Sequence, residues 1–104
     1  MYRQFGLFIG GQWQASISGA TAPVFSPVTE QSLGDCPVAS VADTEAALAS
    51  ADGGFRAWAA TPAFDRAEAL HRIADEMIRR ADEAARMISL ETGKPIAQAG
   101  REWG

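Results

Sequence analysis

The charged residues of this 104-residue chain are concentrated in its second part. Residues 1–41 carry three charged side chains, Arg3, Glu30 and Asp35, whereas residues 42–104 carry the other nineteen. The first part is rich in Gly, Pro, Ser, Thr and β-forming residues, and the second is rich in Ala, Arg, Glu and Asp. These compositions favour strands and helices respectively, so the sequence predicts β-hairpins over residues 1–39 and helices over residues 40–104.

Two hairpins are expected in the first part. Gly10 and Gly11 separate two short apolar or aromatic runs at residues 5–9 and 12–15, and tight hairpin turns favour glycine because they need positive φ. A second pair of strands is predicted at residues 23–25 and 32–38. Prolines in this second pair cannot donate ladder hydrogen bonds, which is typical of edge or irregular strands.

Helix starts and stops can be placed in the second part from capping residues. Ser40 followed by Asp43 resembles a capping box, and Thr61 before Pro62 predicts a second start with Thr61 as the cap. A break is expected near residues 80–82, with Asp82 as the next cap. Gly93 should end that helix, and Pro95 should open the last one.

The middle of the helical part carries an apolar stripe at helical spacing, with charged residues mostly off it. We expect a partner for such a stripe, because several exposed apolar side chains on one face mark an interaction surface. The residues of the stripe are Ala67, Leu70, Ile73, Ala74, Met77 and Ile78.

Composition excludes several classes of function. The formal net charge of −4 and the pI near 4.8 argue against a nucleic-acid-binding protein, which normally shows a basic patch. No apolar run approaches the roughly 18–20 residues that a membrane-spanning helix needs. Cys36 is the only cysteine, so neither an internal disulfide nor a cysteine-rich zinc site can form. These features predict a soluble, cytoplasmic chain.

The remaining candidate catalytic residues have plainer interpretations. Cys36 follows Asp35, and a negative neighbour opposes thiolate formation, which favours a structural or incidental cysteine that behaves as a small hydrophobic residue. His71 has no second ligand at metal-binding spacing, which favours a helix-surface position. The acidic pairs at residues 75–76 and 82–83 alternate with arginines, as on a solvated, ion-paired helix face. Lys94, the only lysine, lies in a predicted tight corner between two helices.

Four segments, in register along the chain, resemble the opening of NAD(P)-dependent aldehyde dehydrogenases. Within that superfamily they are most similar to succinate-semialdehyde dehydrogenases and related bacterial enzymes. The matching segments are residues 7–13 (LFIGGQW), residues 25–30 (FSPVTE, near the family's NPATGE), residues 55–58 (FRAW) followed by Thr61, Pro62 and Arg66, and residues 90–95 (LETGKP).

The resemblance implies that the chain is the N-terminal portion, residues 1–104, of the dinucleotide-binding domain of a larger α/β enzyme. In that family a cysteine attacks the aldehyde to form a thiohemiacetal, hydride passes to NAD or NADP, and water releases the acid. The residues for these steps lie beyond the matching segment, so the resemblance implies no catalytic or cofactor-binding residue here and an inactive chain. It also implies a homo-oligomeric parent with an aldehyde substrate. The last helical pattern stops at Trp103 and Gly104, which we interpret as the edge of a larger fold.

One family site is implied for this segment. Many members hold a structural monovalent cation with an acidic side chain before the Gly-Lys-Pro corner and a backbone carbonyl in the early strand. Glu91 and the carbonyl of Phe25 fall at those positions, with glutamate in place of the usual aspartate. Oxygen ligands suit a hard cation.

Two alternatives remain from the residues alone. One is a free-standing helical assembly or binding module that uses the apolar faces. The other is an independent enzyme using His71, Cys36 or the carboxylates.

Overall fold

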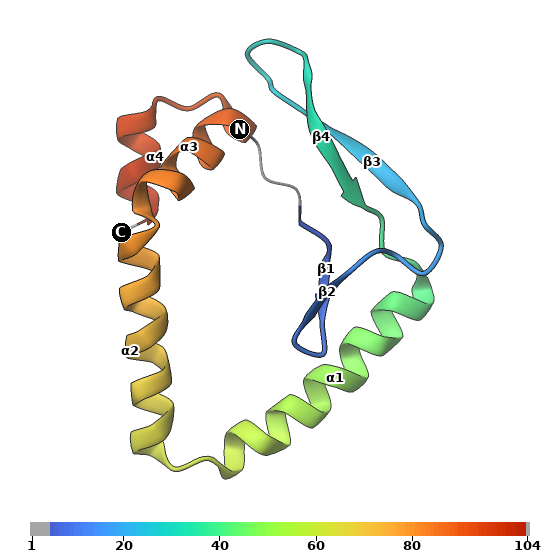
Figure 1. Cartoon of the computed structure of the whole chain (residues 1–104), viewed down its shortest axis with the longest axis vertical. Coiled ribbons are helices and arrows are strands. Elements are labelled where there is room, and N and C mark those ends of the chain that lie inside the picture. Colours follow the sequence, from blue (N-terminus) through green and yellow to red (C-terminus); the bar gives the residue numbers. More distant parts are fainter. Residues whose placement is uncertain (1–4, 104) are drawn as a thin grey trace. The chain divides into compact units, whose positions relative to one another are not determined.

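The computed structural model describes residues 5–103, within which four strands precede four helices (Figure 1). The predicted order of β-hairpins followed by helices is therefore confirmed. The elements are β1 (Leu7–Ile9), β2 (Gln12–Gln14), β3 (Thr21–Phe25), β4 (Ser32–Pro37), α1 (Val41–Ala60), α2 (Ala63–Arg79), α3 (Ala81–Thr92) and α4 (Ile96–Trp103).

The β1–β2 hairpin forms as its glycine pair predicts. Gly10 and Gly11 have φ angles of 61° and 79°, the combination that a tight primed turn requires. The strands are antiparallel, and Phe8 lies opposite Trp13 with their ring centroids 4.9 Å apart. Phe5 also stacks against Trp13, at 5.0 Å between centroids. Trp13 thus packs against two phenylalanine rings.

A turn at residues 26–31 joins β3 to β4. The buried Ser26 organises it: its hydroxyl accepts hydrogen bonds from the backbone N–H groups of Val28 and Thr29, both at 3.3 Å. The Ser26 N–H in turn donates to the carbonyl of Gln31 at 2.9 Å. β3 and β4 form a two-stranded sheet, so both strands have a free edge and tolerate proline as predicted.

The chain divides into two compact units. Within the described residues, the first unit comprises residues 5–24 and 34–61, and the second comprises residues 25–33 and 62–103. The division runs through the β3–β4 sheet, so the turn at residues 26–31 belongs with α2, α3 and α4.

Asp43 organises the first unit. It occupies the third position of α1, and its carboxylate accepts hydrogen bonds from the Ser40 N–H at 2.8 Å and hydroxyl at 2.7 Å, which confirms the capping box. The same carboxylate accepts from the Ser16 hydroxyl at 2.8 Å and the Ile17 N–H at 3.1 Å. Two turns further along α1, the Ser50 hydroxyl accepts from the Gly10 N–H at 3.2 Å. The hairpin region is therefore attached to α1 by polar contacts.

In the helical part, the predicted breaks are confirmed but two predicted caps are wrong. Thr61 does not cap α2, because its hydroxyl donates back to the carbonyl of Ala57 in α1, and Pro62 occupies the N-cap position. Asp82 does not cap α3, because Arg80 stands at the N-cap and Asp82 lies in the first turn. Gly93 ends α3 in the left-handed conformation, as predicted.

The hydrophobic core is small. Among the described residues, Ala85 of α3 and Ala99 of α4 are the buried hydrophobic side chains, and α3 packs on α4 around them. Larger apolar side chains are mostly exposed, including Leu70, Ile73 and Ile78 of the predicted stripe. The stripe therefore has no full partner within the described chain.

Candidate functional site

The corner between α3 and α4 lies against the turn at residues 26–31. Gly93 has a φ of 72°, and a Cβ atom on it would lie 3.1 Å from Val28 Cγ2 and 3.2 Å from Pro27 Cγ. A contact that short requires the neighbouring side chains to move. Gly93 therefore satisfies two demands at once, a left-handed backbone and a close approach to the turn.

Hydrogen bonds within the corner hold its backbone in place. The Ser89 hydroxyl donates to the carbonyl of Lys94 at 2.7 Å, and the Lys94 N–H donates to the Thr92 hydroxyl oxygen at 3.3 Å. The Lys94 ammonium forms an ion pair with Glu102 of α4. These contacts confirm the predicted tight corner at the only lysine of the chain.

The two predicted cation ligands lie on the two segments that meet at this corner. Phe25 is the last residue of β3, two positions before Pro27, and Glu91 lies in the last turn of α3, two positions before Gly93. Both residues are exposed. Across residues 5–103, no three His, Cys, Asp or Glu side chains are grouped so that they could hold a metal ion. Within the described residues, the corner therefore holds no cluster of acidic side chains.

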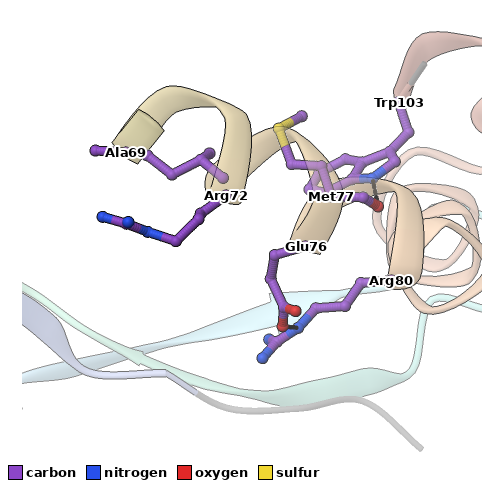
Figure 2. A pocket seen from close by; sticks show the side chains of 7 residues that line it. Ala69, Arg72, Glu76, Met77, Arg80 and Trp103 are labelled. Atoms are coloured by element: carbon purple, nitrogen blue, oxygen red, sulfur yellow. Dashed lines mark hydrogen bonds and ion pairs between the residues drawn. The ribbon is translucent and has the colours of Figure 1, made fainter. Parts of the chain in front are cut away.

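A groove with a volume of about 570 Å³ lies between α2 and the end of α4 (Figure 2). Trp103 forms one wall, and its indole N–H donates to the carbonyl of Met77 at 2.7 Å. That carbonyl lies in the last turn of α2, where it also accepts a hydrogen bond from the Arg80 N–H at 3.2 Å. The groove is lined by Ala69, Arg72, Ile73, Glu76, Met77, Arg80 and Trp103.

Of the charged side chains beside the groove, Glu76 and Arg80 form an ion pair within residues 5–103 and Arg72 does not. Glu76 forms ion pairs with both Arg79 and Arg80, each at 2.5 Å. Hydrogen bonding from Arg79, and then from Arg80, lowers the pKa of Glu76 to about 2. Arg72 lies apart from the Glu76–Arg80 pair (Figure 2), and no acidic partner for it is found in the described part of the chain. The predicted ion-paired face is thus confirmed at Glu76.

The other candidate catalytic residues are not brought together. His71 is exposed on α2, as predicted. Cys36 lies exposed on β4, which fits the expected incidental cysteine and not a packed structural one. The side chains at residues 82–83 are exposed in the first turn of α3.

Sequence reasoning missed two polar contacts that connect distant segments. It recognised Asp43 only as a helix cap, and it treated Trp103 only as a member of an apolar pattern. The serine-rich stretch at residues 16–18 was the one available signal for the first contact. Nothing in the sequence pattern indicates the second.

A model of the Aldehyde dehydrogenase family matches residues 13–104. The chain belongs to the aldehyde dehydrogenase family. Among curated family members, "Aminoaldehyde dehydrogenase 2" from Zea mays is 40% identical over 100 residues, which cover 90% of this chain and 20% of the relative. The resemblance inferred from the four segments is therefore confirmed.

Solved aldehyde dehydrogenases have the same fold over this segment. The succinate-semialdehyde dehydrogenase from Burkholderia pseudomallei superposes with a TM-score of 0.91 at 39% identity, covering 97% of this chain and 21% of its own. An NAD-dependent aldehyde dehydrogenase from Sinorhizobium meliloti superposes with a TM-score of 0.94 at 33% identity, covering 100% of this chain and 21% of its own. This chain thus spans about a fifth of the length of the aldehyde dehydrogenases it matches.

None of the helices within residues 5–103 is both long and apolar enough to span a bilayer.

Proposed function

We propose that this chain contributes part of the dinucleotide-binding domain of an enzyme that oxidises an aldehyde to a carboxylic acid with NAD or NADP. The observation that supports the proposal is the family match over residues 13–104, together with the close superposition on solved aldehyde dehydrogenases. In the net reaction, an aldehyde, water and NAD(P)⁺ become a carboxylate, NAD(P)H and two protons.

The described residues do not themselves fit a dinucleotide or a catalytic nucleophile. A dinucleotide fingerprint places glycines between a strand and a helix, whereas Gly10 and Gly11 lie between β1 and β2. Cys36 is exposed on β4, and its neighbour in sequence is the acidic Asp35. We therefore assign no step of the reaction to these residues and propose that this chain alone is inactive.

The test compares this chain with a chimera. In the chimera, residues 13–103 replace the matching fifth of the Burkholderia pseudomallei succinate-semialdehyde dehydrogenase. We expect no NAD(P)H from the chain alone with semialdehydes and either cofactor, and we expect the chimera to retain the activity of the unmodified relative. NAD(P)H formation by the chain alone would contradict the proposed inactivity. A folded chimera without activity would contradict the proposed function.

Within the class of aldehydes, we propose a semialdehyde as the substrate, and succinate semialdehyde is the first candidate. Its support is that one superposed relative is a succinate-semialdehyde dehydrogenase and that the Zea mays relative is an aminoaldehyde dehydrogenase. We also propose that the enzyme is a cytoplasmic homo-oligomer. A panel of aldehydes of different chain length and terminal charge, assayed with the whole gene product, tests the substrate class directly.

We further propose that Glu91 and the carbonyl of Phe25 contribute to a structural monovalent cation site. The support is local: Gly93, two residues after Glu91, approaches Pro27 and Val28, which lie two and three residues after Phe25. Carboxylate and carbonyl oxygens suit a hard cation, and the remaining ligands must come from water or from other segments.

Melting in sodium or potassium chloride, against choline chloride at equal ionic strength, tests this cation site. We expect the alkali cations to raise the melting temperature of the chimera, and Glu91→Gln to remove that difference. Glu45→Gln on α1 is the matched control and should leave the difference intact. An identical melting temperature in all three salts would disprove the site.

A second candidate function is a free-standing helical assembly module, favoured by the exposed apolar side chains of α2. Sedimentation of the chain alone distinguishes the two. A discrete, cooperatively melting dimer would favour the module, whereas a monomer or an aggregating species would favour the enzyme segment.

A further inference from the structure

We draw no further inference here: the strongest candidate, the aromatic patch that Phe8 and Trp13 expose on the β1–β2 hairpin, is an apolar face for which nothing in the described residues shows what covers it.

Discussion

The Ser16 hydroxyl donates a hydrogen bond of 2.8 Å to the carboxylate of Asp43, 27 residues further along the chain. This bond joins the segment after β2 to the first turn of α1. Both side chains are buried, so water cannot replace either partner. The start of the longest helix and the placement of the first hairpin therefore depend on one carboxylate.

Asp43→Asn should destabilise the first unit markedly. The substituted amide would direct an N–H₂ group at atoms that now donate to the carboxylate, including the Ser40 N–H and the Ser16 hydroxyl. Asp52→Asn is the control, because Asp52 forms only an exposed pair with Arg56 and such pairs contribute little. Urea unfolding followed by circular dichroism measures both. Equal midpoints for the two variants would contradict this role of Asp43.

Acid should weaken the fold over a defined range of pH. Hydrogen bonds from the Ser40 backbone and hydroxyl, with further ones from Ser16 and Ile17, lower the pKa of Asp43 from 3.8 to about 2. A lowered pKa in the folded state means that the carboxylate stabilises the fold above pH 3.8 and that this contribution is lost as the pH falls toward 2.

The measurement is the unfolding midpoint as a function of pH. The slope between pH 4 and 2 should be smaller in Asp43→Asn than in the unmodified chain. Glu76→Gln should also reduce the slope, but that reduction should shrink in high salt because Glu76 is partly exposed. A slope unaffected by Asp43→Asn would rule out this account.

Gly93→Ala should lower the free energy of unfolding more than Gly19→Ala does. Both glycines have left-handed φ angles, 72° and 69°, so alanine should cost about 1 kcal/mol at either position. At Gly93, the new Cβ would also press on Val28 and Pro27, whereas nothing lies within 4 Å at Gly19. The difference between the two losses in unfolding free energy therefore measures the contact of the corner with the turn, and a zero difference would mean that the contact is loose.

Trp103→Phe should loosen the end of α2. Phenylalanine keeps most of the ring but cannot donate to the Met77 carbonyl, and loss of one hydrogen bond costs about 1 kcal/mol. Trp58→Phe is the control, because no hydrogen bond of the Trp58 indole is found in the described chain. Hydrogen exchange of the last-turn amides of α2 should accelerate in Trp103→Phe only.

Gly53→Ala should stabilise α1. A Cβ atom at Gly53 meets nothing within 4 Å, and alanine is preferred to glycine inside a helix by roughly 1 kcal/mol. Gly6→Ala should have the opposite effect, because its Cβ would lie 2.5 Å from the carbonyl oxygen of Gln14. Thermal melting measures both variants. A higher melting temperature for Gly53→Ala would indicate free space at Gly53, and a lower one would indicate that a neighbouring backbone approaches Gly53 closely.

Local chemistry explains which parts of the fold could be predicted from the sequence. The glycine pair at residues 10–11, the Ser40–Asp43 capping box and the stop at Gly93 each depend on residues within a few positions of one another. Their conformational demands are therefore visible in the sequence itself. The cap predictions at Thr61 and Asp82 were wrong because a hydroxyl or carboxylate near a helix start can also point elsewhere, as the Thr61 hydroxyl does toward Ala57.

Contacts between distant segments could not be predicted in this way. The Ser16–Asp43 and Trp103–Met77 bonds join residues 27 and 26 positions apart, and their geometry depends on how whole helices and loops pack. Prediction of Phe25 and Glu91 as ligands came from the family resemblance and not from residue chemistry. The groove depends on the packing of α4 beside α2, which hydrophobic periodicity alone does not specify.

The division of the chain into two units has a practical consequence for dissecting it. Each unit is built from two separate stretches, since residues 25–33 belong with the helices that begin after residue 61. A single proteolytic cut therefore cannot release either unit whole. A peptide beginning at Ala63 would lack Pro27 and Val28, the side chains that Gly93 approaches. Only a rearranged gene, with the turn at residues 26–31 re-joined to the helices by a linker, would encode that unit as one continuous polypeptide.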